Sequence, residues 1–147
     1  MPILAIDPGG TIGWCYVDAQ HETWSGTIAA HGIWRPGLQK LFEVAHVEQA
    51  VLVVEDIEPR ILTECQTHRS WEKLISTFYD TLQMAREFGI KTIRVRPRDW
   101  MEATIGDPMR TKKRASRLVG RKINTEHEAD AICMAYWQLE REAGRSK

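Results

Sequence analysis

The stretch ILAIDPGGTIGW, residues 3–14, joins one apolar run to another through a glycine-rich turn. The first run predicts a buried strand over 2–7, and the second predicts a strand over 12–18. Asp7 closes the first strand, where taking a carboxylate out of water costs free energy unless a positive group pairs with it. Two kinds of partner would account for this carboxylate, a metal ion or a set of phosphate-binding main-chain amides.

The rest of the chain predicts an α/β domain built around these two strands. The alternating stretch 23–34 predicts a third strand, and the short connections predict an antiparallel meander. Further along, we expect a helix over 38–49, a strand over 50–56, a helix over 64–88, a strand over 91–97, basic helical turns over 98–122 and a closing helix from near Thr125. The order β-β-β-α-β-α-β-α predicts one domain over 1–147, a mixed five-stranded sheet flanked by helices.

Composition excludes several classes of protein. The chain has 147 residues, of which 43% are apolar and 27% charged, as in ordinary globular domains. It has no uninterrupted apolar run of ~18 residues, and its N-terminus lacks the features of a signal peptide, so we expect a cytoplasmic protein without a membrane span. Cys15, Cys65 and Cys133 are scattered, which argues against a zinc site or a disulfide framework.

Positive charge is concentrated in one segment of a chain whose net charge is zero. Residues 94–122 contain ten Lys and Arg against three acids, a net +7, so the remainder carries −7. Such a segment indicates a polyanion partner on one face of the protein. Taken alone, a basic run more often marks a solvated helix surface than a binding site.

Four polar residues are predicted to meet at one edge of the sheet. Asp7 and Glu55 end the two most apolar strands, and such strand ends share an edge if the strands are neighbours. Two carboxylates at close range repel unless a cation neutralises them, and oxygen donors suit magnesium or manganese. His127 and Asp130 lie three residues apart on one face of the closing helix. Singly, each of the four also has a purely structural interpretation, as a turn former, an edge acid, a core histidine or a helix-dipole acid.

These motifs resemble a known pattern of active-site residues. Asp7 in AIDPGGTIGW, Glu55 in VLVVED and His127-x-x-Asp130 in EHEADAICMA are similar to the active site of the RuvC family of Holliday-junction resolvases. The stretch RPRDWMEATIG followed by Lys112 resembles that family as well. The resemblance implies an RNase H-like fold, in a compact, phage-type member. It also implies a structure-selective DNA endonuclease that resolves four-way junctions by metal-dependent phosphodiester hydrolysis, nicking symmetrically as a homodimer.

The resemblance also implies roles for individual residues. Two Mg²⁺ or Mn²⁺ ions would be held with Asp7 as the bridging ligand, while Glu55 and Asp130 would each complete one ion's shell. His127 would be either a metal ligand or a base that orients water. The helix 64–88, with Leu74 and Met84, is a candidate dimer interface. Phosphates of branched DNA would be contacted by Arg110, Lys112, Lys113, Arg114, Arg117, Arg121 and Lys122.

Other functions stay open at this stage. The alternatives are another RNase H-like DNA or RNA nuclease and a junction-binding protein without catalysis. DPGGTIGW also resembles the first phosphate loop of actin-like ATPases and sugar kinases, in which Asp7 would hold magnesium and Gly9, Gly10 and Thr11 would cradle phosphate. Those kinases need a second Asp-x-Gly turn, and none occurs after residue 11.

Overall fold

A five-stranded mixed sheet forms the centre of the protein. The computed structural model describes residues 1–29, 34–57, 69–101 and 108–145. The sheet has the order β3-β2-β1-β4-β5. β1, β2 and β3 form the predicted antiparallel meander, and β4 lies parallel to β1 and to β5. The strands are Ile3–Asp7 (β1), Thr11–Val17 (β2), Thr23–Ala29 (β3), Val51–Glu55 (β4) and Thr92–Val95 (β5). The predicted fold class, a mixed α/β sheet flanked by helices, is confirmed.

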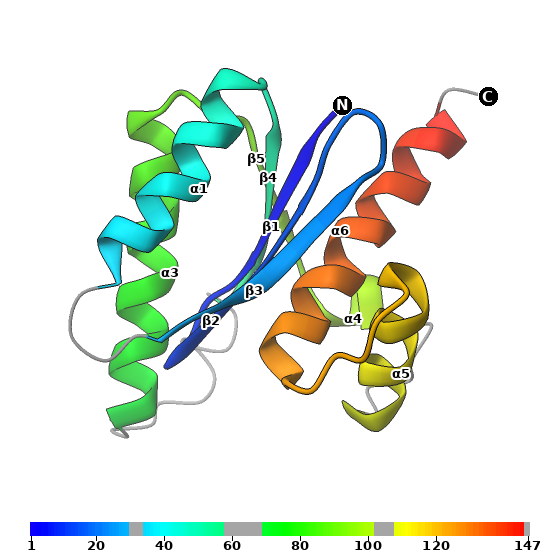
Figure 1. The fold of residues 1–147 in the computed structure, drawn as a ribbon. Coiled ribbons are helices and arrows are strands. Elements are labelled where there is room, and N and C mark those ends of the chain that lie inside the picture. Colours follow the sequence, from blue (N-terminus) through cyan, green and yellow to red (C-terminus); the bar gives the residue numbers. More distant parts are fainter. Residues whose placement is uncertain (30–33, 58–68, 102–107, 146–147) are drawn as a thin grey trace.

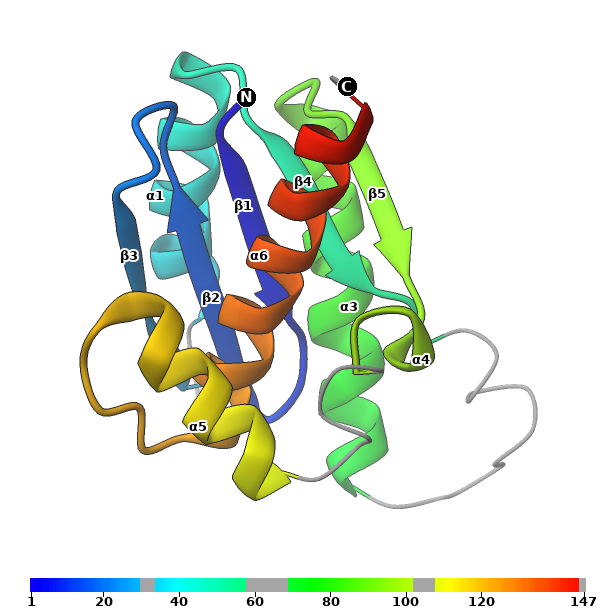
Figure 2. The ribbon, with the colours of Figure 1, turned by 90° about the vertical axis from the view of Figure 1, so that its right-hand side faces the viewer.

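Helices cover both faces of this sheet (Figure 1). α1 (Arg35–Val47) and α3 (Arg69–Glu87) lie on one face. α6 (Glu126–Arg145) crosses the other face, accompanied by α4 (Pro97–Trp100) and α5 (Pro108–Val119). Figure 2 shows α6 running over β1 and β2, with α5 beside its N-terminal half. Within the described part of the chain, no helix is both long and apolar enough to cross a membrane.

β1 divides the hydrophobic core into two layers. Successive side chains of a strand point to opposite faces, so a strand buried on both faces is apolar throughout. Ile3 and Ala5 pack into the layer beneath α6, whereas Leu4 and Ile6 pack into the layer beneath α1 and α3. All four side chains are completely buried. This explains why the first stretch of the chain has a continuous apolar run instead of an alternating pattern.

Two element boundaries differ from the sequence prediction. The strand predicted over 23–34 ends at Ala29, and residues 30–33 lie outside the described part. α1 begins at Arg35, before the predicted start, with Pro36 in its first turn. A proline is compatible with that position because the first helical N–H groups have no partner within the helix. Pro36 therefore belongs to the helix start and not to a turn that separates two elements.

The face of α3 that was predicted to form a dimer interface lies mostly inside the protein. Met84 is only 5% exposed and belongs to the core layer beneath α1 and α3, and Leu74 packs against the same layer. The helical spacing that marks an apolar stripe does not say which protein surface covers it, so Met84 was wrongly assigned to an interface. Tyr79 is the large apolar side chain of the described part of α3 that remains exposed. Residues 64–68 of the predicted helix lie outside the described part.

The basic segment forms two helices. The predicted strand 91–97 is shorter, Thr92–Val95, and α4 starts at Pro97. Asp99 accepts a hydrogen bond from the main-chain N–H of Arg96, which caps this short helix. The predicted helical turns over 98–122 therefore correspond to α4 and α5, with residues 102–107 outside the described part.

Candidate metal-binding active site

Two buried carboxylates lie side by side at the carboxyl ends of β1 and β4. The parallel register pairs Ile6 with Val54, so the next residues, Asp7 and Glu55, are neighbours. Asp7 is 5% exposed and Glu55 is 9% exposed. The strand order that the sequence prediction required for this arrangement is therefore present. Burial of two acids at one sheet edge sets up a strongly negative environment.

The first turn of α6 brings a histidine to the same edge. Nδ1 of His127 lies 3.2 Å from Oδ2 of Asp7, a hydrogen bond that joins residues 120 positions apart in the sequence. The His127 side chain is 44% exposed, whereas that of Asp7 is 6% exposed. The imidazole therefore contacts the buried carboxylate on one side while remaining open to solvent on the other.

Asp130 belongs to the same electrostatic cluster. Burial, the largest cause, acts together with the negative charges of Asp7 and Glu55 to raise the pKa of Asp130 to about 8. A smaller contribution of the same sign comes from Glu126, and His127 acts in the opposite direction. Because the charges of both strand-end acids raise its pKa, the carboxyl group of Asp130 lies near Asp7 and Glu55. The sequence-derived set Asp7, Glu55, His127 and Asp130 thus gathers in one region.

The donor chemistry of this cluster fits a hard divalent cation. Three carboxylates and an imidazole provide the oxygen and nitrogen ligands that such ions take. Within residues 1–29, 34–57, 69–101 and 108–145, no three His, Cys, Asp or Glu side chains lie close enough together to hold a metal ion as they stand. After burial, the negative charges of Asp7 and Glu55 contribute to the raised pKa of Asp130. A cation between these carboxylates would neutralise part of their charge.

The glycine turn after Asp7 is anchored to α3. Thr77 is completely buried, and its Oγ1 accepts a hydrogen bond from the Gly9 main-chain N–H at 2.9 Å. The same hydroxyl donates to the Lys73 carbonyl at 2.8 Å, as serines and threonines within helices often do. The Gly9 amide therefore has a partner in the protein, which argues against the phosphate-cradle alternative for this turn. Sequence reasoning missed Thr77 because a threonine on a core-facing helix has no distinguishing pattern.

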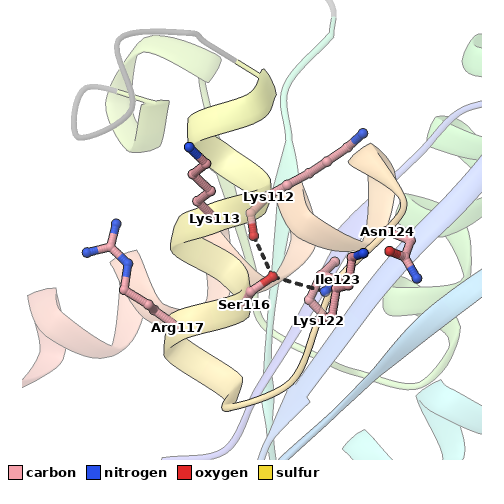
Figure 3. A pocket seen from close by; sticks show the side chains of 7 residues that line it. All are labelled: Lys112, Lys113, Ser116, Arg117, Lys122, Ile123 and Asn124. Atoms are coloured by element: carbon pink, nitrogen blue, oxygen red, sulfur yellow. Dashed lines mark hydrogen bonds between the residues drawn. The ribbon is translucent and has the colours of Figure 1, made fainter.

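Basic side chains surround a pocket between α5 and the start of α6 (Figure 3). The pocket has a volume of about 680 Å³. Ser116 holds its wall together, since the Ser116 hydroxyl donates to the Lys112 carbonyl and accepts from the Ile123 N–H. Four of the predicted DNA-binding residues are among its lining residues, which are Lys112, Lys113, Ser116, Arg117, Lys122, Ile123 and Asn124. Its last lining residue, Asn124, precedes the start of α6 by two residues and His127 by three.

Two other predicted DNA-binding residues have partners inside the protein. An Arg114 nitrogen lies 3.6 Å from Oε1 of Glu140 on α6. An Arg121 nitrogen lies 2.9 Å from Oε2 of Glu128, whose side chain is only 12% exposed. The remaining predicted residue, Arg110, is exposed on α5. A count of positive residues in the sequence does not distinguish cations that face solvent from those that pair with an acid far along the chain.

Comparison with known proteins agrees with the geometry at the level of the fold. No protein-family model and no curated protein sequence matches this chain. Among solved structures, Thermus thermophilus RuvC in complex with a Holliday junction substrate superposes with a TM-score of 0.70 at 16% sequence identity, covering 98% of this chain and 96% of that one. The chain has the RuvC fold. Another structure of Thermus thermophilus RuvC gives a TM-score of 0.69 at 17% identity, covering 98% of this chain and 97% of RuvC.

The crowding of acids around Asp130 predicts a pH-dependent cost in stability. The pKa of Asp130 rises from 3.8 to about 8 on folding. The folded protein therefore holds this carboxyl group protonated at a pH where the unfolded chain has released the proton. The stability that this group contributes is complete below pH 4 and is lost as the pH rises through 8. In metal-free protein kept in chelator, Asp130→Asn should therefore raise the melting temperature at pH 7.5. The gain should shrink toward zero near pH 4.

A second carboxylate serves as the control for this measurement. Asp80 on α3 accepts a hydrogen bond from the Trp34 indole at 3.2 Å, and Asp80→Asn removes a negative charge without relieving an acidic cluster. Its melting temperature should not exceed that of the wild type at either pH. Equal melting temperatures for the wild type and Asp130→Asn at pH 7.5 would contradict the electrostatic description of the site.

Proposed function

We propose that this protein is a divalent-metal-dependent DNA endonuclease that resolves four-way junctions. The observation that carries the proposal is the meeting of Asp7, Glu55, His127 and Asp130 at one sheet edge. The RuvC fold over nearly the whole chain supports the same function, because the RuvC structure that this chain resembles holds a Holliday junction substrate. The basic pocket beside the N-terminus of α6 supplies a surface for the phosphates of such a substrate.

Three carboxylates would hold the metal in this site. Asp7 lies between Glu55 on the neighbouring strand and His127 on α6, which suits it to bridge two ions. Glu55 and Asp130 would each complete the shell of one ion. Two Mg²⁺ or Mn²⁺ ions bound here supply an activated water and stabilise the departing oxygen of a phosphodiester.

His127 is suited to handle a proton beside this metal site. The His127 side chain is 44% exposed, so its imidazole can exchange protons with water. Its hydrogen bond to Asp7 holds the ring at the site and fixes which nitrogen faces the carboxylate. We assign His127 the role of a base that orients water, with metal ligation as the alternative.

The basic pocket would bind the phosphate backbone. Lys and Arg contacts to phosphate position DNA without reading its sequence, which suits an enzyme that selects a branched shape. Lys112, Lys113, Arg117 and Lys122 line one pocket and would contact neighbouring phosphates of the backbone. A homodimer with two-fold symmetry would place two such sites on a junction of the same symmetry and nick it symmetrically.

Removal of either strand-end carboxylate should separate cleavage from binding. Asp7→Asn and Glu55→Gln should abolish junction cleavage in magnesium, because each removes a metal ligand. Junction affinity in chelator should stay equal or become tighter, since loss of a negative charge near phosphate reduces repulsion. Cleavage of a labelled four-way junction and its binding to the protein provide the two measurements. Glu43→Gln, on the exposed side of α1, is the control and should cleave at the wild-type rate.

Three results would contradict this proposal. Wild-type cleavage by Asp7→Asn would remove the metal site from the mechanism. Tight junction binding by the wild type without any cleavage in Mg²⁺ or Mn²⁺ would identify a junction-binding protein without catalysis. Cleavage of linear duplex or an RNA–DNA hybrid as fast as the junction would identify a general RNase H-like nuclease.

Substitutions of His127 should distinguish proton handling from packing. His127→Ala should reduce the cleavage rate by ~10²–10⁴-fold, as the loss of a general base does. His127→Asp should retain more activity than His127→Ala, because a carboxylate also accepts a proton and binds metal. The pH profile of cleavage should bend in the wild type and change shape in His127→Asp. Equal rates in the two variants with an unchanged profile would make His127 a packing residue.

Loss of a pocket cation should weaken binding in a salt-dependent way. Arg117→Ala should reduce affinity similarly for junctions of different sequence and lower the salt slope by up to ~0.9. The matched control is Arg141→Ala, since the Arg141 guanidinium lies over the Trp137 ring, 4.6 Å from its centre, on the later part of α6. That variant should keep the wild-type slope. The same slope in both variants would place the DNA on another face of the protein.

A further inference from the structure

The N-terminus of α6 rests directly on the main chain of β2. A Cβ atom on Gly13 would lie 1.9 Å from the carbonyl oxygen of His127 and 2.2 Å from its carbonyl carbon. It would also lie 2.8 Å from the Glu128 nitrogen. These are main-chain atoms, so no side-chain rotation relieves the contact. A real Cβ atom essentially never comes within 3.0 Å of such a neighbour, so a side chain at position 13 would force β2 and the start of α6 apart by about 1 Å, the difference between 3.0 and 1.9 Å.

Gly13 touches both members of the Asp7–His127 pair. Across the antiparallel β1–β2 pairing, Gly13 is the register partner of Asp7. On its other side, it contacts the carbonyl group of His127. The 3.2 Å contact between His127 Nδ1 and Asp7 Oδ2 therefore depends on a strand position without a side chain.

A hydrogen-bond network around Glu128 also holds the first turn of α6 in place. Glu128, the residue after His127, accepts a 2.7 Å hydrogen bond from the Ser25 hydroxyl on β3 and a 2.9 Å hydrogen bond from the Arg121 guanidinium. Arg121 also donates to the Ser25 hydroxyl, which closes a three-residue network. A carboxylate in the first turn of a helix is favoured by the helix dipole as well. The network joins β3, the segment after α5 and the start of α6.

We propose that Gly13 and Glu128 are positioning residues that set His127 and Asp130 against the strand-end carboxylates. Gly13 sets the height of the α6 start above β2, and the Glu128 network sets its lateral position. Neither residue needs to touch the substrate. The inference rests on the proposed function, and it places Arg121 in the protein framework instead of on the DNA. Misplacement of a catalytic group by about 1 Å reduces a rate by ~10²-fold, so the effect is large enough to measure.

Two variants with matched controls test the proposal. Gly13→Ala should lose ~10²-fold in the rate constant of cleavage. Glu128→Ala should lose ~10–100-fold in that constant and in Mn²⁺ affinity measured by calorimetry with the metal alone, as outer-shell partners of metal sites do. Junction affinity in chelator should be unchanged in both, because the basic pocket is intact. The first control is Gly26→Ala, whose added Cβ would approach the Trp14 ring at 3.0 Å, a side chain that can move. The second is Glu140→Ala, which removes from the same helix an exposed acid that also pairs with an arginine, Arg114.

The position of the His127 ring can also be tested by a measurement that does not depend on cleavage activity. The ¹⁵N chemical shifts of the His127 ring, identified by their absence in His127→Ala, should change in Gly13→Ala and Glu128→Ala but not in the controls. If the wild type neither cleaves junctions nor binds Mn²⁺, the proposed function is wrong, and the ring shifts still decide the positioning role.

Three results would overturn the inference. The first is a Gly13→Ala protein that folds with wild-type ring shifts and cleavage. The second is an equal loss in Glu128→Ala and Glu140→Ala, which would indicate a general charge effect. The third is weaker junction binding by Glu128→Ala in chelator, which would place this network at the DNA surface. If Gly13→Ala fails to give a melting transition, the comparison of Glu128→Ala with Glu140→Ala decides alone.

Discussion

Asp7 and Glu55 are buried next to each other because β1 and β4 pair in parallel with Ile6 opposite Val54. This pairing places two acids at the edge of an apolar sheet. The other groups at that end of the molecule interact with the negative charge of these two acids. α6 approaches with Asp130, whose pKa is raised by burial and by these two charges, and with His127, which opposes the rise. The side chains of β1 alternate between two apolar core layers, and the carboxylate of Asp7 follows them at the end of the strand.

Positive charge in this chain has two separate uses. Arg114 and Arg121 pair with acids of α6 and so hold helices together. Lys112, Lys113 and Lys122 line a solvent-filled pocket beside the start of α6. The acidic cluster and the basic pocket meet near residue 126, where α6 begins, so a bound phosphate backbone would be close to the carboxylates. The neutral net charge of the chain conceals this local separation.

Much of the fold could be predicted from the sequence, because its signals are local. The apolar runs, the glycine turn and the position of Asp7 and Glu55 at strand ends follow from patterns within a few residues. The contacts that hold the site together are not local. Thr77 binds Gly9 across 68 positions, and Ser25 binds Glu128 across 103, so neither pair leaves a pattern in the chain. The interface assignment of Met84 failed for the same reason, since spacing defines a stripe but not what covers it.

The burial of Asp130 among other acids has a consequence for how this protein evolves or is engineered. An acidic side chain that is kept in an unfavourable environment because a reaction needs it lowers the stability of the fold. Substitution of a neutral residue at that position stabilises the protein. Selection for heat resistance alone would therefore favour exchange of this acid, and with it the loss of a proposed metal ligand, while the sheet and helices remain unchanged. Persistence of the acid in stabilised variants would show that selection acts on the chemistry of the site as well as on the fold.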